Sequence, residues 1–405
     1  MNLKLLAFLL IILSFRFSFF YNNQPQFTDG QQVSFETALL SEPRIVGGQQ
    51  RLTANLASGN KVFVTTSLFP SFHYGNRLYI VGKLNKRLLN RNFILVMYFP
   101  KIEEVNNQAG WLDKSLKTIN DLRQSLISLF SRTLPSPSSS LLMGIIFGIK
   151  QDLPKDFSDN LKTTGVFHVI AASGMNVTLI AGFISTFFAF FLKRQIAIGL
   201  SILGIIFYAV LAGLEASIIR ASIMGILVFS AQIMGRQTLA VNGLFLAGFA
   251  MLFLDPTLIS DIGFQLSFTA TLGLILIPKI RAIGKIGVIG NSVNTTIAAQ
   301  IATLPILMAN FGIYSIYSVL VNGLVLWTVP ILMVIGGIGA IAGLIFAPVG
   351  QLIIYLCYPL LIYFEKIVEI FGKIGGVINV QSIQWQFIAA YYCLLISALI
   401  IFKKK

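Results

Sequence analysis

The chain is short of the residues that build metal centres and disulfide frameworks. Among its 405 residues are only two histidines, His73 and His168, and two cysteines, Cys357 and Cys393. No CxxC pair, no HxHxDH-type cluster and no Walker GxxxxGK[ST] sequence occurs, and each of those chemistries needs its ligands at such spacing. The sequence therefore predicts no metal, no cofactor and no enzymatic activity for this chain.

Charge is also scarce, at 11% of residues, whereas apolar residues make up 56% and the mean hydropathy is +0.81. A helix needs about 20 apolar residues to cross a bilayer, and the chain has about ten runs of that kind. We therefore predict a polytopic α-helical membrane protein with about ten spanning or re-entrant helices, at residues 3–21, 164–192, 196–214, 216–234, 238–254, 259–278, 292–313, 316–346, 350–371 and 387–402.

The excess of Lys and Arg over acidic residues, 30 against 15, is uneven along the chain. Basic residues gather in alternate loops and in the tail, which the positive-inside rule assigns to the cytoplasm. The sequence thus predicts a multi-pass protein of the plasma membrane with both termini cytoplasmic and the segment after the first helix outside. Residues 1–24 are expected to be an uncleaved anchor; a signal peptide is the alternative, but no small-x-small cleavage site follows.

Residues 28–102 have a different texture from the rest. Five short runs rich in β-branched and aromatic residues, at 33–40, 49–56, 61–69, 76–84 and 92–99, alternate with Gly, Asn and Pro turns. Such spacing predicts a small extracytoplasmic β-barrel of the oligonucleotide-binding (OB) kind, inserted after the first helix.

This segment carries nine Lys or Arg residues against three acidic ones. Basic grooves with aromatic platforms bind single-stranded nucleic acid through phosphate attraction and base stacking. The alternative is a solvated barrel whose aromatic residues form its core and whose charge is attracted to anionic membrane lipids. The candidate DNA-binding residues are Arg44, Arg51, Lys61, Arg77, Lys83, Lys86, Arg87 and Arg91, interleaved with Phe63, Phe69, Phe72, Tyr74 and Tyr79.

Two shorter segments lead into the membrane part. Residues 103–135 place apolar side chains three or four positions apart, which predicts a pair of amphipathic helices on the outer membrane surface. The apolar run 141–149 is too short to cross, so we expect it to be re-entrant or packed between helices.

The domain at residues 136–402 places polar residues inside its apolar runs. The segment 165–178, GVFHVIAASGMNVT, interrupts a predicted span at Ser173-Gly174, and a broken helix is tolerated in a membrane only where it faces protein or a wet cavity. Glu215 and Arg220 lie in another span, where an isolated charge is costly. Each polar residue alone fits ordinary helix–helix bonding; together they favour a hydrated conduit.

These residues resemble the competence domain of the ComEC family of DNA-uptake channels. The resemblance rests on 168–177 (HVIAASGMNV), Leu211-Ala212-Gly213 with Ser217 and Arg220, 263–268 (GFQLSF), and Gln300 with Thr303 and Pro305. It departs from the family's usual pattern at Met175-Asn176. The resemblance implies that a DNA path passes His168, Ser173, Gly174, Asn176, Arg220, Gln265, Ser267, Gln300, Pro305 and Asn322.

The resemblance also implies a function, which is passage of one DNA strand across the cytoplasmic membrane during natural transformation. The expected partners are single-stranded DNA, membrane lipids, a DNA receptor on the outer face, a separate nuclease that degrades the other strand, and a cytoplasmic ATP-driven motor. We expect the basic barrel to concentrate the incoming strand. Backbone N–H groups at the Ser173-Gly174 break, together with Arg220, would then offset the cost of phosphate inside the bilayer.

Two other functions stay open. A small-solute or ion transporter also uses broken helices at mid-membrane, although no inverted repeat is evident. An intramembrane serine hydrolase would need a base within reach of Ser173, and His168 lies five residues earlier, about 140° around a helix.

Overall fold

The computed structural model describes residues 3–23, 27–39, 43–56, 61–72, 75–89, 92–105, 111–149, 153–170, 174–214, 216–235, 239–277, 287–379 and 385–403. The chain divides into two compact units, each described here by itself. Unit 1 comprises residues 1–126, 209–214 and 249–257. Unit 2 comprises residues 127–208, 215–248 and 258–405.

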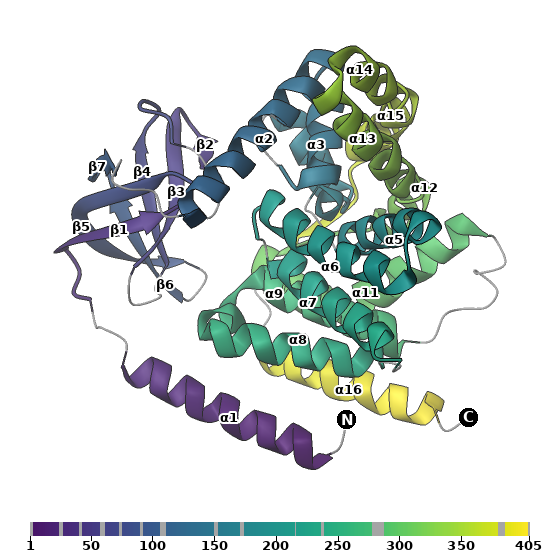
Figure 1. The fold of residues 1–405 in the computed structure, drawn as a ribbon. Helices are drawn as coiled ribbons and strands as arrows, with labels where there is room; N and C mark the ends of the chain where they lie inside the picture. The colour runs from purple at the N-terminus through teal and green to yellow at the C-terminus, as the bar shows by residue number, and fades with distance from the viewer. Residues whose placement is uncertain are drawn as a thin grey trace. The chain divides into compact units, whose positions relative to one another are not determined.

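Unit 1 contains a curved seven-stranded sheet (Figure 1). Its hydrogen-bonded path runs β1-β5-β6-β4-β3-β2, and β7 pairs with β5. All neighbours are antiparallel except β4 and β6, which are parallel. The strands are β1 (Gln31–Ala38), β2 (Arg44–Val46), β3 (Gln49–Asn55), β4 (Lys61–Ser67), β5 (Arg77–Leu89), β6 (Asn92–Tyr98) and β7 (Lys101–Glu104).

The five predicted strands are therefore present as β1, β3, β4, β5 and β6, and the sheet is an OB-like half-barrel. Strands β1 and β2 lie at the two ends of the hydrogen-bonded path, and Asn55 of β3 reaches back to β1 through its backbone N, which donates to Thr37 Oγ1 at 3.2 Å. Alternate residues of β3 and β4 are buried in one apolar core. Such alternation is what a sheet with one solvated face requires.

A single helix follows the sheet. Helix α2 (Trp111–Thr133) is continuous, so the predicted pair of amphipathic helices is wrong. The first residues assigned to that pair, 103 and 104, belong to β7, where they pair with Tyr79 and Leu78. An edge strand extended by pairing with β5 overrides the weak helical pattern of a few residues.

Helices account for the rest of the described chain (Figure 1). In order they are α1 (Leu3–Asn22), α3 (Ser138–Phe147), α4 (Lys155–Thr163), the 3-10 turn η1 (Phe167–Val169), α5 (Gly174–Phe191), α6 (Arg194–Leu211), α7 (Ala216–Ile233), α8 (Ala240–Leu254), η2 (Pro256–Ser260), α9 (Ile262–Leu276), α11 (Val288–Phe311), α12 (Ser318–Val325), α13 (Thr328–Ile345), α14 (Ala347–Tyr355), α15 (Tyr358–Ile374) and α16 (Trp385–Lys403). Two short strands, β8 (Ile313–Ser315) and β9 (Val377–Asn379), pair antiparallel.

Every predicted apolar run coincides with one or two of these helices. Within the described residues, five helical segments are long and apolar enough to cross a membrane, and a sixth is added if α14 and α15, bent by 43°, form one span. The remaining apolar runs contain shorter apolar helical stretches of 10–17 residues, at Ala7–Asn22, Ala240–Leu254, Ile262–Leu276 and Gln386–Leu399. Together the helices and the sheet fit a membrane protein that carries an OB-like domain.

Two runs predicted as single spans are broken. The run 316–346 divides into α12 and α13, and the run 350–371 falls across α14 and α15. Pro330 lies in the first turn of α13 and Pro359 in the first turn of α15. Proline fits the first helical turn without loss of a hydrogen bond, and each new helix begins just before its proline.

Small residues let the helices of unit 2 approach closely. A Cβ on Gly350 of α14 would overlap the backbone of Gly343 in α13, and a Cβ on Gly273 of α9 would lie 2.7 Å from the carbonyl oxygen of Ala298 in α11. Helix α3 is buried along its whole length and packs against α13 and α15, as expected for the short run 141–149. Glycine contacts of this kind are the usual means of packing helices in a membrane.

Candidate functional site

The outward side of the sheet carries cations beside exposed aromatic rings. The register places Arg51 of β3 opposite Thr65 of β4, and Thr65 opposite Tyr98 of β6. Tyr98 is 48% exposed, and its hydroxyl accepts a hydrogen bond from Arg87 Nη1 of β5 at 3.3 Å. Strands β3, β5 and β6 thus bring two guanidinium groups and one ring to the same side of the sheet.

Lys61 and Phe63 extend this surface along β4. Both point to the same side as Thr65, because residues two apart share a face of a strand. Phe63 is 41% exposed. We call this surface the basic aromatic face; its members are Arg51, Lys61, Phe63, Arg87 and Tyr98.

The aromatic residues of the sheet divide into buried and exposed rings. Phe72 is buried in the sheet's core, whereas Phe69 is 77% exposed. With Phe63 and Tyr98, Phe69 is therefore available for stacking rather than used for packing. Tyr74 lies outside the described residues, and Tyr79 is half-buried.

The other candidate cations of the sheet are less concentrated. Arg77 and Lys83 are exposed on β5, and Lys86 is exposed near the end of that strand, where its backbone N donates to Asp29 Oδ1 at 2.7 Å. Arg44 belongs to β2, with its Cα opposite that of Arg51, and Arg91 lies outside the described residues.

Lys101 on β7 differs from these cations because it is paired. Its Nζ lies 2.7 Å from Glu103 Oε1. This hydrogen bond, together with the charge of Glu103, raises the pKa of the lysine. A cation neutralised in this way attracts phosphate less than one without an ion pair, and among the described residues no ion pair is recorded for Arg51, Lys61 or Arg87.

Two of the predicted path residues meet where α5 begins. Gly174 is the first residue of α5, and a Cβ there would lie 3.1 Å from Arg220 Nη2 of α7. Arg220 is only 6% exposed, and its Nη1 donates to Thr271 Oγ1 of α9. The Thr271 hydroxyl in turn donates to the carbonyl oxygen of Ser267, another predicted path residue, at 2.9 Å. We call Gly174, Arg220 and Thr271 the arginine cluster.

A second polar cluster lies around Gln300 of α11. Its Nε2 donates to Ser318 Oγ of α12, and its Oε1 accepts from the Tyr314 hydroxyl at 3.3 Å. Gln300 and Tyr314 also line a cavity of about 220 Å³ between α11 and α12. We call Gln300, Tyr314 and Ser318 the glutamine cluster.

His168 lies next to the glutamine cluster through the backbone of Gly165. Gly165 has a φ of +74°, and a Cβ there would collide with the Cβ of Ser318. The Nδ1 of His168 lies 3.2 Å from the carbonyl oxygen of Gly165. Ser173, the partner that a hydrolase would need, lies outside the described residues.

The side-chain amide of Asn176 is hydrogen-bonded to the end of a neighbouring helix. Its Nδ2 donates to the carbonyl oxygen of Ile145 at 2.7 Å, and Tyr208 Oη donates to that of Ile146 at 2.8 Å. Both carbonyls belong to the last turn of α3, which has no intrahelical donors for them. Asn176 therefore completes a buried helix end.

Pro305 leaves one carbonyl of α11 without its helical donor, because proline has no N–H group. The residue four positions earlier is Ile301, whose carbonyl oxygen accepts instead from the Tyr391 hydroxyl of α16 at 2.8 Å. The next carbonyl, that of Ala302, accepts from the Tyr392 hydroxyl at 2.9 Å. Helix α16 thus supplies hydrogen-bond donors to the two carbonyl groups that precede Pro305 by four and three residues.

The remaining path residues are separate from both clusters in the described contacts. Gln265 Nε2 donates to the carbonyl oxygen of Ile259 at 2.8 Å, which closes the turn before α9. Asn322 of α12 is 1% exposed, and its Oδ1 has no partner among the described residues. The predicted path residues thus sort into two clusters and several individually bonded groups. A single conduit through all of them stays a prediction.

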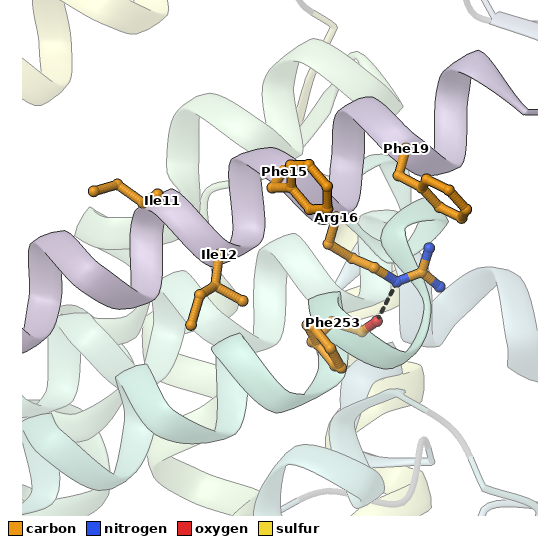
Figure 2. A pocket seen from close by; sticks show the side chains of 6 residues that line it. All are labelled: Ile11, Ile12, Phe15, Arg16, Phe19 and Phe253. Atoms are coloured by element: carbon orange, nitrogen blue, oxygen red, sulfur yellow. Dashed lines mark hydrogen bonds between the residues drawn. The ribbon is translucent and has the colours of Figure 1, made fainter.

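Arg16 of α1 provides a further membrane-depth cation within unit 1. Its Nε donates to the carbonyl oxygen of Phe253 at 3.1 Å, near the end of α8 (Figure 2). Its guanidinium carbon lies 5.5 Å from the centre of the Phe20 ring. These contacts border an apolar groove of about 490 Å³, and a cation at a helix C-terminus is electrostatically favourable.

No group of three or more His, Cys, Asp or Glu side chains that could hold a metal ion occurs within the described ranges.

Comparison with known proteins gives two findings. The Competence protein family matches residues 145–405. ComE operon protein 3 of Bacillus subtilis (strain 168) is 28% identical over 227 residues, which is 55% of this chain and 28% of that protein. The alignment thus spans little more than a quarter of the relative's length. No solved structure matches the chain.

Proposed function

Because this chain belongs to the competence protein (ComEC) family, we propose that it passes single-stranded DNA across the cytoplasmic membrane during natural transformation. One observation carries the proposal. The residues that match the family include helices α5 to α16, and polar side chains form clusters within these apolar helices. Buried polar and ionisable residues at membrane depth are costly and are retained for transport paths.

The sheet supports the outer half of this proposal. The basic aromatic face offers cations for phosphate oxygens and exposed rings for bases, which are the two ingredients of sequence-independent single-strand binding. We propose that this face receives the strand outside the membrane.

The helical unit supports the inner half. The arginine cluster supplies a fixed positive charge, and the glutamine cluster supplies donors and acceptors without charge. A polyanion crossing a low-dielectric region needs both, because charge offsets desolvation and neutral groups avoid holding each phosphate too tightly. Energy and strand degradation are assigned in this proposal to a cytoplasmic motor and a separate nuclease.

The test is transformation of a strain that lacks the gene. We expect deletion to abolish uptake of donor DNA into the cytoplasm and the full-length chain to restore it. Uptake that persists undiminished in the deletion strain would refute the proposal.

The receiving role has its own measurement. Full-length protein in nanodiscs should bind a labelled single strand with an affinity that falls steeply between 50 and 200 mM salt, in the manner of phosphate contacts. Equal and negligible binding at low and high salt would remove the sheet from the path.

A further inference from the structure

We infer that the N-terminus of α5, together with Arg220 and Thr271, forms a binding site for one phosphate group. The inference depends on the proposed function only for the identity of the ligand, a phosphodiester of the passing strand. The site itself is argued from the arginine cluster, and its charge, helix end and close packing are three separate observations.

The charge of Arg220 is the first observation. The guanidinium is 6% exposed, its described hydrogen-bond partner is a neutral hydroxyl, and its Nε has no hydrogen-bond partner among the described residues. A buried cation without a counter-charge is strongly unfavourable, whereas one paired with an anion is tolerated. Arg220 is therefore set up to receive an anion.

The end of α5 is the second observation. Its 18 residues begin at Gly174, so the N–H groups that have no acceptor within the helix, and the positive end of the helix dipole, lie beside Arg220. Two positive features at one place repel each other unless an anion lies between them. The side chain of Met175, in the same first turn, is 39% exposed, so this helix end is accessible.

Thr271 fixes the orientation of the guanidinium. Its hydroxyl donates to the carbonyl oxygen of Ser267 at 2.9 Å and is thereby turned to accept from Arg220 Nη1. Nε and Nη2 then remain on the other edge of the guanidinium, and Nη2 lies toward Gly174. Two N–H groups on one edge are the fork that binds two oxygens of a phosphate. Thr271 is thus a positioning residue.

Gly174 keeps the site open. A Cβ at this position would lie 3.1 Å from Arg220 Nη2 and 3.3 Å from the Cβ of Ala221. Both distances are tighter than ordinary contact, so a methyl group would push the guanidinium away from the helix end. A Cβ placed on Gly182, two turns further along α5, would have no neighbouring heavy atom within 4 Å. Gly182 is therefore a matched control.

The experiment measures thermal unfolding of the full-length protein in nanodiscs with inorganic phosphate, against sodium chloride of equal ionic strength. We expect phosphate to raise the unfolding temperature of the wild type, because a ligand that binds only the folded state stabilises it. No phosphate-specific shift in the wild type would overturn the inference.

The variants assign the site. Arg220→Gln should abolish the phosphate-specific shift, and Arg220→Lys, which keeps the charge without the fork, should weaken phosphate binding by about tenfold. Thr271→Val and Gly174→Ala should each weaken it by roughly fivefold, and Gly182→Ala should stay within about twofold of the wild type. Wild-type binding by Arg220→Lys and Gly174→Ala together would overturn the inference, even if Arg220→Gln fails to fold.

A substitution at Glu215 tests whether a carboxylate of the protein already fills the site. Glu215 lies five residues before Arg220 and outside the described residues. Glu215→Gln should leave the phosphate affinity within about twofold. A much larger gain in affinity would mean that its carboxylate already fills the site, and the inference would be wrong.

Transformation separates this inference from the proposed function. A wild-type chain that restores transformation but binds no phosphate refutes the site alone. A chain that binds phosphate but is dispensable for transformation refutes the function alone.

Discussion

The sheet of unit 1 carries its cations on its surface, whereas unit 2 also places one cation in its interior. The sheet exposes several cations, among them Arg51, Lys83 and Arg87, whereas the helical unit buries Arg220 at 6% exposure. An exposed cation is screened by salt and contributes little by itself. A buried cation is screened far less, and its contacts depend on atomic position. Binding on the sheet should therefore be redundant and salt-dependent, and contacts among the helices should be individually essential.

We expect the largest effect from a substitution at a close helix–helix contact of unit 2. Gly350→Ala should lower the free energy of unfolding by roughly 3 kcal/mol or prevent folding, because the added methyl group overlaps the backbone of Gly343. Gly337→Ala, with nothing within 4 Å, is the matched control. Denaturation of the two variants in mixed micelles provides the comparison, and equal stability would show that the helices yield more readily than we infer.

Charge removal on the sheet should have a graded effect. The triple variant Arg51→Gln, Lys61→Gln and Arg87→Gln should reduce the slope of log affinity against log salt by about 2, since each phosphate contact with a single strand contributes about 0.7. Titrations of a labelled single strand at several salt concentrations measure this slope. Lys101→Gln, which removes a cation paired with Glu103, should change the slope much less. An equal change for Lys101→Gln and Arg51→Gln would contradict the assignment of the basic aromatic face.

Stacking on the sheet should be separable from charge. Phe63→Ala should weaken single-strand binding by roughly 1–3 kcal/mol while leaving the salt slope unchanged, because stacking on a ring releases no counterions. The matched control is Ile45→Ala, which removes another exposed apolar side chain without a ring. If both variants bind equally well, Phe63 is not a platform for bases.

The smallest effect concerns the interrupted helix α11. Tyr391→Phe should destabilise the helical unit by about 0.6 kcal/mol, a typical value for a hydrogen bond between membrane helices. In a Pro305→Ala background the restored N–H can reach the carbonyl oxygen of Ile301, so the same change should cost less. Tyr392→Phe, which acts on Ala302, should show no such coupling to Pro305. A double-mutant cycle in mixed micelles measures the difference.

The sequence anticipates the elements better than their partners. Apolar runs of spanning length and period-two alternation identify helices and strands because burial depends on each residue's own chemistry. Hydropathy cannot locate the breaks at residues 326–327 and 356–357, because apolar residues continue through each turn. The local sign of each break is the proline that follows it, Pro330 or Pro359, since proline is favoured in the first turn of a helix.

The sequence alone could not predict which residues far apart in the chain contact one another. Tyr98, Thr271 and Ser318 carry no local signal, since each acquires its role from a residue at least 11 positions away. Asn176 shows another limit, because the sequence shows a polar residue in a membrane segment but not that its amide donates to the end of α3. Only an arrangement in space separates an amide that is open to a ligand from one that is occupied by a backbone carbonyl.

The hydroxyl bonds from Tyr391 and Tyr392 to α11 have a consequence for biosynthesis. The carbonyl of Ile301 receives its donor from a residue 90 positions later in the chain. Until the ribosome has produced α16, the carbonyl oxygen of Ile301 lacks this donor, and an unsatisfied carbonyl is unfavourable in a membrane. The packing of α11 is therefore complete only when α16 arrives, and a nascent chain released before residue 391 lacks this contact.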